Sequence, residues 1–191
     1  MSVKILGGLA RGFPLATPKT DLRPTSVMLK RKLFDWRQDL SGWEFADICA
    51  GSGAMGFEAL SRGADKIILN DADRGAFQTL KKNQTDLMEK FSFAKDLFHL
   101  THLDARKWML REFGFTGLGS ESILYIDPPY RDHDLYRDLL KELRDKGYAG
   151  EVWIESDHKI GLSLDELTGA IHSVIKTVEH GDHFVLVGKL V

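Results

Sequence analysis

Residues 127–130, D-P-P-Y, have types and an order that could do chemistry. The two prolines fix the backbone and remove its N–H donors. The polar groups that remain are hydrogen-bond acceptors, the carboxylate of Asp127 and the carbonyl of Pro128, beside the flat ring of Tyr130. Two acceptors next to an aromatic ring suit a planar substrate with an exocyclic amine. The motif therefore predicts a catalytic loop made of Asp127, Pro128, Pro129 and Tyr130.

An amine on an aromatic ring is a weak nucleophile, because the ring delocalises its lone pair. Acceptors that take its N–H bonds would draw the nitrogen towards tetrahedral geometry and free the lone pair. With an already activated methyl donor, alignment of the reactants then supplies much of the rate, and neither a strong base nor a metal is needed. The alternative is a rigid turn with an exposed tyrosine. The position of D-P-P-Y directly after the apolar run S-I-L-Y-I argues against that alternative.

A second informative stretch is D-I-C-A-G-S-G-A-M-G, residues 47–56. Gly51, Gly53 and Gly56 match the dinucleotide pattern G-x-G-x-x-G, which brings a ligand to the N-terminus of a helix, and positive φ is expected at the first two. The carboxylate of Asp47 argues against a dinucleotide, since it would repel a pyrophosphate. S-Adenosylmethionine has no phosphate and carries a sulfonium and an ammonium group. The loop is therefore predicted to bind S-adenosylmethionine.

Further acidic residues follow the next strand-like runs. Asp71 lies twenty positions after Gly51 and is predicted to accept the ribose hydroxyls of an adenosine, a role common to NAD and S-adenosylmethionine. Asp73 is expected to cap the following helix. Asp104 could accept the adenine amino group or cap a helix, and both interpretations stay open. Glu155 ends another strand-like run and could line the site.

These residues need a scaffold, and the chain after residue 40 alternates short apolar runs with amphipathic stretches. Such repeated units predict a parallel sheet with helices on both faces. The last two runs are joined by a short turn and must pair antiparallel. We therefore predict an α/β, Rossmann-like class I methyltransferase fold, with a mostly parallel sheet and an antiparallel last strand. The predicted strands cover 45–49, 66–70, 97–103, 122–126, 151–155, 171–178 and 183–190, and the predicted helices 54–62, 74–90, 104–113, 134–146 and 163–170.

Residues 1–40 have a different pattern and are predicted to form an N-terminal extension on a main domain of residues 41–191. Two short strand-like pieces around glycines precede a helix over 26–36, with Thr25 or Ser26 as its cap. Residues 1–37 hold eight basic and two acidic side chains, although the whole chain carries a net charge of −2. A basic segment on an acidic body is expected to meet a polyanion.

The composition limits the class of protein. With 191 residues, 43% hydrophobic and 28% charged, the chain is typical of a soluble globular protein. Its one cysteine, Cys49, excludes an internal disulfide, and neither a membrane-length apolar run nor a signal-like N-terminus is seen. A cytoplasmic monomer is therefore expected. The pairs His99/His102 and His180/His183 have no third ligand nearby, so no metal site is predicted.

Several motifs together resemble one family, the bacterial small-subunit (16S) ribosomal RNA guanine-N2 methyltransferases, or RsmD-like family. They are the extended loop D-I-C-A-G-S-G-A-M-G-F-E-A-L-S-R-G-A, the D-P-P-Y loop, L-R-P-T followed by K-L-F-D-W, and the opening V-K-I-L-G-G. The resemblance covers nearly the whole chain. Three positions depart from the family pattern, Cys49, Asp71 and Tyr130, where phenylalanine, glutamate and phenylalanine are frequent.

The resemblance implies a set of roles. S-Adenosylmethionine would be bound by Asp47, Ala50, Gly51, Ser52 and Gly53, with Asp71 and Ala72 at the ribose, Asp104 and Ala105 at the adenine, and Asp127 next to both cofactor and base. The N-terminal segment would bind ribosomal RNA, or RNA within the small ribosomal subunit, as the partner. Its implied contacts, together with Tyr130, are Arg11, Arg23, Thr25, Lys30 and Arg31.

Two alternatives remain at this stage. D-P-P-Y also suits the N6 amine of adenine, in DNA or RNA. An NAD-binding oxidoreductase, or a binder without catalytic activity, could use the same glycine loop.

Overall fold

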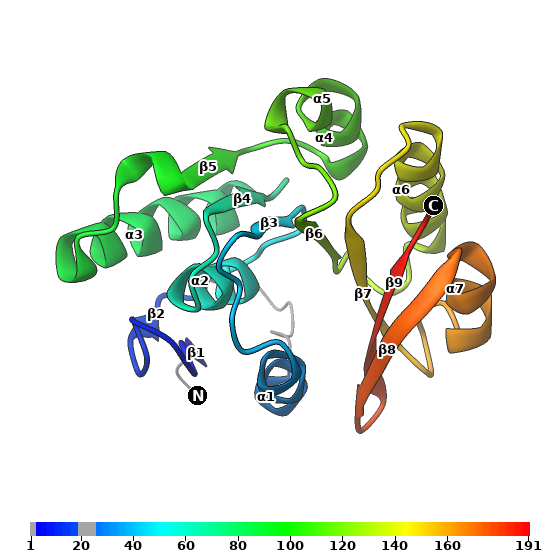
Figure 1. The fold of residues 1–191 in the computed structure, drawn as a ribbon, viewed down its shortest axis with the longest axis horizontal. Coiled ribbons are helices and arrows are strands. Elements are labelled where there is room, and N and C mark those ends of the chain that lie inside the picture. The colour runs from blue at the N-terminus through cyan, green and yellow to red at the C-terminus, as the bar shows by residue number, and fades with distance from the viewer. Residues whose placement is uncertain (1–2, 19–25) are drawn as a thin grey trace.

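The computed structural model describes residues 3–18 and 26–191, and it centres on a seven-stranded sheet (Figure 1). The strand order is β5-β4-β3-β6-β7-β9-β8. The strands are β3 (Glu44–Asp47), β4 (Lys66–Asn70), β5 (Phe98–Thr101), β6 (Ser122–Ile126), β7 (Glu151–Asp157), β8 (Ser173–His180) and β9 (His183–Lys189). The helices between them are α2 (Ala54–Ser61), α3 (Arg74–Phe91), η1 (Lys95–Leu97), α4 (Ala105–Arg111), α5 (Phe113–Thr116), α6 (His133–Asp145) and α7 (Leu164–Ala170).

Strands β3 to β7 pair parallel, whereas β9 lies between β7 and β8 and runs antiparallel to both. The short connection between β8 and β9 turns at Gly181, whose φ is 63°. Such a tight turn can only join antiparallel neighbours. The predicted fold, a mostly parallel sheet with an antiparallel last strand, is therefore confirmed.

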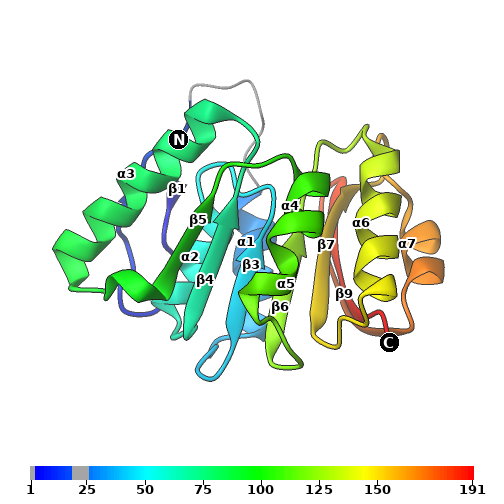
Figure 2. The same cartoon turned by 90° about the horizontal axis from the view of Figure 1, so that it is seen from above.

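Helices cover both faces of the sheet (Figures 1 and 2). Helices α2 and α3, with α1 (Val27–Trp36), share one hydrophobic cluster with Phe45, Ile67 and Tyr125 of the sheet. Helices α4 to α7 pack on the opposite face, against residues such as Ile68 and Leu124. Because successive strand residues point to opposite faces, each central strand supplies both clusters.

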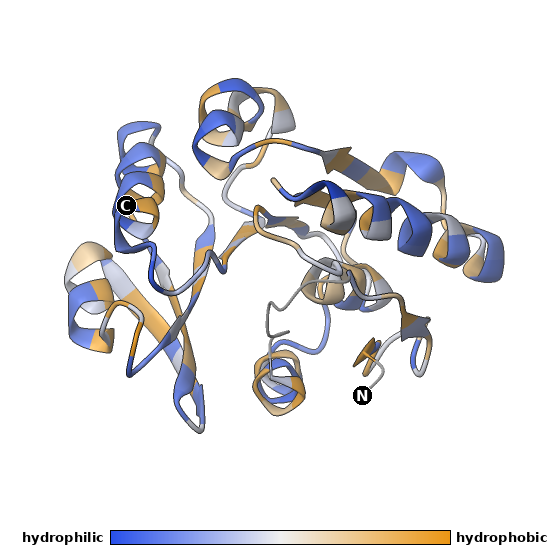
Figure 3. Cartoon of the chain, turned by 180° about the vertical axis from the view of Figure 1, so that it is seen from behind, coloured by the Kyte–Doolittle hydropathy of each residue, from blue (hydrophilic) through white to orange (hydrophobic). Residues whose placement is uncertain are grey.

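Amphipathic spacing explains why these helices dock on the sheet. In α3 the buried residues are Ala76, Leu80, Asn83 and Leu87, which lie three or four positions apart on one face. Figure 3 shows the mixture of hydrophilic and hydrophobic colour along α3 and α6 that this pattern produces. Within the two described ranges, no helix has the length and apolar character that crossing a membrane requires.

The N-terminal segment packs on the main body through apolar side chains. Strands β1 (Val3–Lys4) and β2 (Pro14–Leu15) form a two-stranded antiparallel sheet. Leu15 of this hairpin and Leu33 of α1 belong to the same buried cluster as the central sheet. Ser26 precedes α1 as predicted, but its side chain makes no capping hydrogen bond. The division of the chain at residue 40 stays a prediction.

Side-chain caps mark the starts of α3 and α7, and one predicted helix differs in extent. Asp73 caps α3 as expected, and Ser163 caps α7 through a reciprocal capping box with Glu166. The single helix predicted over 104–113 is wrong in extent, because α4 and α5 are separate helices that continue to Thr116. Gly117, with φ of 75°, then ends α5.

Candidate active site

The predicted acidic residues meet at the carboxyl edge of the parallel strands. Asp47 ends β3 and is in register with Leu69 of β4 and Tyr125 of β6. Asp71 directly follows β4 and Asp127 directly follows β6. The loops that leave these strands lie along the upper edge of the sheet in Figure 2. Ligands of open α/β sheets bind at this edge.

The glycine loop between β3 and α2 has the backbone that its sequence predicts. Gly51 and Gly53 have φ angles of 54° and 77°, so both lie in the left-handed region that favours glycine. A Cβ at Gly53 would meet Phe57 and Leu80, and one at Gly56 would meet Leu69 at 2.3 Å. A Cβ at Gly51 would have nothing within 4 Å. Gly53 and Gly56 therefore serve close packing, whereas Gly51 is the loop position with open space beside it.

Asp71 joins this loop to the end of β4. Its Oδ2 accepts a 2.7 Å hydrogen bond from Gly51 N, and its Oδ1 accepts one of 2.8 Å from Asp73 N. Burial raises the pKa of Asp71, while these two hydrogen bonds act in the opposite direction. Each carboxylate oxygen has a further lone pair. The backbone contacts therefore orient the carboxylate and leave it able to accept hydroxyl groups.

Asp47 is a buried carboxyl group with little local compensation. Its side chain accepts a 3.3 Å hydrogen bond from Cys49 N. Burial raises the pKa of Asp47 well above its ordinary value, and the charges of Asp71 and Glu155 raise it further. A cation bound beside the loop would relieve this repulsion, whereas an anion would increase it. Burial also raises the pKa of the Cys49 thiol, so that thiol is not activated as a nucleophile.

The D-P-P-Y loop presents its groups at the same edge. Asp127 and Tyr130 are half-buried, Pro128 is buried and Pro129 is exposed. The hydroxyl of Tyr136 in α6 donates to the carbonyl of Glu155 at 2.8 Å and lies 3.4 Å from the carbonyl of Pro128. Because the shorter bond takes most of the hydroxyl's hydrogen-bonding capacity, the Pro128 carbonyl retains acceptor capacity.

Glu155, two residues before the end of β7, supports this loop from inside. It is fully buried, and its carboxylate accepts hydrogen bonds from the hydroxyls of Tyr125 and Tyr130. Burial raises the pKa of Tyr130, and the charges of Asp127 and Glu155 raise it further. The phenol therefore stays protonated and remains a donor. The sequence-based expectation that Glu155 lies at the site fits this position.

Asp104 and its neighbours lie after β5. Asp104 caps α4, with Oδ1 accepting from Arg106 N at 3.0 Å and from Lys107 N at 3.3 Å. The capping interpretation of Asp104 is therefore correct, and its role at an adenine stays a prediction. Ala105 is buried, whereas Ala72 is exposed and its carbonyl lies 3.0 Å from Nε2 of His102. His102 in turn stacks on Phe77 at 5.1 Å between ring centroids.

Asn70 is a site-forming residue that the sequence analysis missed. Its Nδ2 donates to the carbonyls of Ile48 and Leu103, and its Oδ1 accepts from Thr101 Oγ1 and Leu103 N. One buried amide thus ties together the ends of β3, β4 and β5. The sequence could have indicated this role, because Asn70 is the last residue of the apolar run K-I-I-L-N. A polar side chain in a buried strand needs hydrogen-bond partners.

The predicted RNA contacts fall into three groups. Arg11 and Arg31 are exposed. Arg23 and Thr25 lie outside the described residues. The expectation that Lys30 contacts RNA at the surface is wrong, because its side chain is only 3% exposed. Its Nζ lies 3.2 Å from Oε2 of Glu58. The buried carboxylate of Glu58 accounts for this position, since a charge inside a protein needs a partner.

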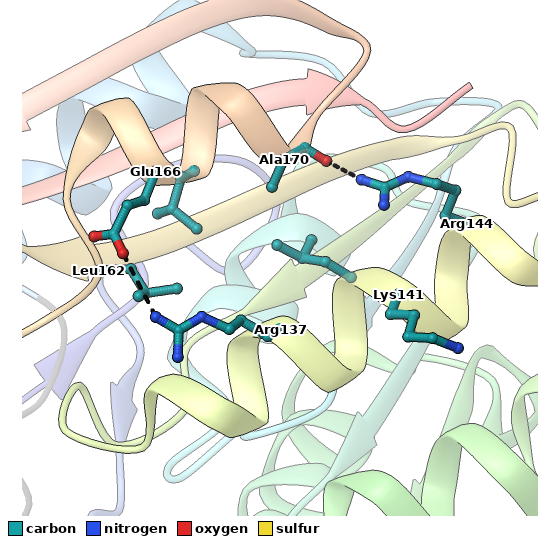
Figure 4. Close-up of a pocket in the computed structure, with 8 residues that line it drawn as sticks. Arg137, Lys141, Arg144, Leu162, Glu166 and Ala170 are labelled. Atoms are coloured by element: carbon teal, nitrogen blue, oxygen red, sulfur yellow. Dashed lines mark hydrogen bonds and ion pairs between the residues drawn. The ribbon is translucent and has the colours of Figure 1, made fainter.

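A cavity of about 320 Å³ lies elsewhere, between α6 and α7 (Figure 4). Arg137 points towards Glu166, with an N–O distance of 3.5 Å, and Arg144 donates to the carbonyl of Ala170. Arg137 and Glu166 are thus paired with each other, and the lining includes none of the predicted site residues. Across residues 3–18 and 26–191, no three His, Cys, Asp or Glu side chains are grouped as a metal site would require.

Comparison with known proteins finds a matching family and several similar proteins that are named as methyltransferases. The family described as "Conserved hypothetical protein 95" matches residues 3–178. Ribosomal RNA small subunit methyltransferase D of Escherichia coli is 30% identical over 176 residues, which are 89% of this chain and 82% of that protein. The protein of the same name from Haemophilus influenzae is 34% identical over 130 residues, 67% of this chain and 64% of that protein. The solved structure of a human methyltransferase 10 domain containing protein, 16% identical, has a TM-score of 0.67 over 92% of this chain and 87% of its own, which shows a shared fold.

Proposed function

The chain belongs to the ribosomal RNA small subunit methyltransferase D family, and on that premise we propose that it methylates the exocyclic N2 amine of a guanine in small-subunit ribosomal RNA. S-Adenosylmethionine is the proposed cofactor, and when bound it supplies an electrophilic methyl group. The observation that carries the proposal is the juxtaposition of the buried Asp47, the open Gly51 and the D-P-P-Y loop at one sheet edge. The DNA alternative is not favoured, because the family relatives are named for ribosomal RNA.

The residues present fit S-adenosylmethionine better than a dinucleotide. The buried carboxyl of Asp47 is repelled by Asp71 and Glu155, so the site favours a cationic ligand. A pyrophosphate beside these acids would be destabilised for the same reason. We propose that Asp47, Ala50, Gly51, Ser52 and Gly53 hold the amino-acid part of the cofactor. Asp71 and Ala72 would bind the ribose, and Asp104 and Ala105 the adenine.

The D-P-P-Y loop would prepare the target amine. The carboxylate of Asp127 and the carbonyl of Pro128 accept its N–H bonds, which frees the nitrogen lone pair. Tyr130 stacks on the base, and its hydroxyl bond to Glu155 anchors the outer end of the ring. Once methylated, the cationic nitrogen is acidic and gives its extra proton to the Asp127 carboxylate, so Asp127 need not be a strong base. Exposed Arg11 and Arg31 would contact RNA phosphates, as would Arg23, and the N-terminal segment would lie on the RNA side.

An in vitro methylation assay tests this proposal. The protein is incubated with methyl-labelled S-adenosylmethionine and RNA from small ribosomal subunits of cells that lack this protein. We expect label in N2-methylguanosine at one nucleotide, which digestion and mass spectrometry would identify. Assembled subunits and free RNA are compared in parallel, with DNA as the control substrate. Label in N6-methyladenosine, or in DNA, would contradict the proposed substrate. Thermal stabilisation by NAD but not by S-adenosylhomocysteine would contradict the proposed cofactor.

A further inference from the structure

Asn83 in α3 is fully buried and connects two distant segments. Its Nδ2 donates to the carbonyl of Ala16 at 3.0 Å and to the carbonyl of Ser52 at 2.9 Å. Its Oδ1 accepts from Ala16 N at 2.8 Å. One side-chain amide therefore holds the N-terminal segment just after β2 and the glycine loop just before α2.

Two other polar side chains hold the same N-terminal segment, but they do so from helix α2. Glu58 accepts hydrogen bonds from the backbone N–H groups of Leu6 and Gly7. Ser61 accepts from Ala10 N at 2.8 Å and donates to the carbonyl of Gly7 at 2.6 Å. Asn83 differs from both because its hydrogen bonds also reach the loop itself.

We propose that Asn83 is a positioning residue that couples docking of the N-terminal segment to the cofactor affinity of the glycine loop. The inference rests on the proposed function, since it takes residues 50–53 as the cofactor loop. If Ala16 leaves its place, Asn83 loses two of its three hydrogen bonds, and the constraint on the Ser52 carbonyl weakens. Coupling between two sites is reciprocal. Bound cofactor must therefore also hold the N-terminal segment, which carries the exposed Arg11 proposed to meet RNA.

The first test compares Asn83→Ala with the matched control Ser61→Ala in the full chain. Both substitutions remove a buried anchor of the N-terminal segment, but Ser61 holds Gly7 and Ala10, and its loss leaves the bonds of Asn83 to Ala16 and Ser52 in place. Titration calorimetry with S-adenosylhomocysteine is expected to show about a tenfold weaker Kd for Asn83→Ala, within the usual range of coupling energies, and no comparable change for Ser61→Ala. Equal weakening in both variants, in step with their melting temperatures, would indicate a merely structural role and overturn the proposal.

The second test uses only the wild-type chain, so it does not depend on how a variant folds. Trypsin cleavage after the exposed Arg11 reports opening of the N-terminal segment. Saturating S-adenosylhomocysteine is expected to slow this cleavage about tenfold, the factor by which docking of the segment strengthens cofactor binding. An unchanged cleavage rate with bound S-adenosylhomocysteine would overturn the coupling and leave the proposed function intact. A wild-type chain that binds no S-adenosylhomocysteine would instead overturn the cofactor assignment and the coupling with it.

Discussion

The hydroxyl of Tyr130 donates a 2.8 Å hydrogen bond to Oε1 of Glu155, while the other carboxylate oxygen of Glu155 accepts one from Tyr125. Strand β7 is a central strand of the sheet, so Glu155 has little freedom to move. The ring beside Asp127 is therefore fixed through its own hydroxyl group and not only through the two prolines before it. Tyr130 can therefore contribute to activity in two ways: its ring can stack on the base, and its hydroxyl bond to Glu155 holds that ring in place.

Substitution of Tyr130 should distinguish these contributions. Tyr130→Phe removes one hydrogen bond, with a net contribution of about 0.5–1.5 kcal/mol, and we expect a loss of about two- to twelvefold in kcat/KM. Tyr130→Ala also removes stacking on the base, which contributes about 1–3 kcal/mol more. Methyl transfer to small-subunit RNA measures both. Tyr148→Phe is the control, since this buried phenol bonds to Ser122 and Glu151 instead. Equal losses for the Phe and Ala variants would contradict stacking.

Asp127→Asn should separate cofactor binding from methyl transfer. The amide keeps the shape of the side chain but replaces an acceptor oxygen with an N–H₂ group that would repel the target amine. By analogy with the loss of a preorganised transition-state hydrogen bond, we expect kcat to fall by about 10²–10³. Affinity for S-adenosylhomocysteine, measured by calorimetry, should change little. Asp134→Asn, at a side chain 85% exposed on α6, serves as control. Full activity of the Asp127 variant would rule out the assigned role.

Much of the fold could be predicted because local patterns determine it. The strand residues 66–70 and 122–126 were predicted with the bounds that the structure has, since continuous apolar runs mark strands buried on both faces. Strand β7 extends to Asp157, two residues past its apolar pattern. Ser156 and Asp157 belong to it because they pair with Phe184 and His183 of β9. That pairing joins positions distant in sequence, and no local pattern contains it.

The contrast between local patterns and contacts distant in sequence also explains which site residues could be predicted. Asp47, Asp71 and Asp127 were placed at one edge because parallel strands bring their carboxyl ends together. The burial of Lys30 could not be predicted, since it depends on Glu58 in another helix. Asn70 and Asn83 likewise act through loops that only the folded chain brings within hydrogen-bond distance. Sequence reasoning found the residues that follow strands and missed those whose partners come from elsewhere.

The buried carboxyl of Asp47 should make the stability of the free chain depend on pH. Its pKa is raised in the folded chain, so above the ordinary value of 3.8 the folded state binds more protons than the unfolded state. The contribution of Asp47 to stability therefore falls as pH rises from that value through the raised pKa. Asp47→Asn removes this ionisation, and urea unfolding between about pH 5 and about pH 8 should show a smaller decline than in the wild type.

The control for this pH dependence is Asp39→Asn. Hydrogen bonds from Ser41 lower the pKa of this exposed carboxyl, so it is ionised throughout the range and its loss should leave the pH slope unchanged. Asp47→Asn should also weaken S-adenosylhomocysteine binding, because the ammonium group of that ligand loses its counter-charge. A variant that binds S-adenosylhomocysteine as tightly as the wild type would contradict the proposed place of Asp47 beside the cofactor.

Substitution of Glu58 should lower the free energy of unfolding more than substitution of any exposed charged residue. It is fully buried, pairs with Lys30 and Arg62, and accepts two backbone hydrogen bonds from the N-terminal segment. Removing one partner of a buried ion pair leaves an uncompensated charge and costs about 3–5 kcal/mol, so Glu58→Ala should lower the free energy of unfolding in urea by that amount. The control Asp86→Ala removes an exposed pair with Lys82, which contributes about 0–1 kcal/mol. Equal effects of the two substitutions would show that the buried cluster does not anchor the N-terminal segment.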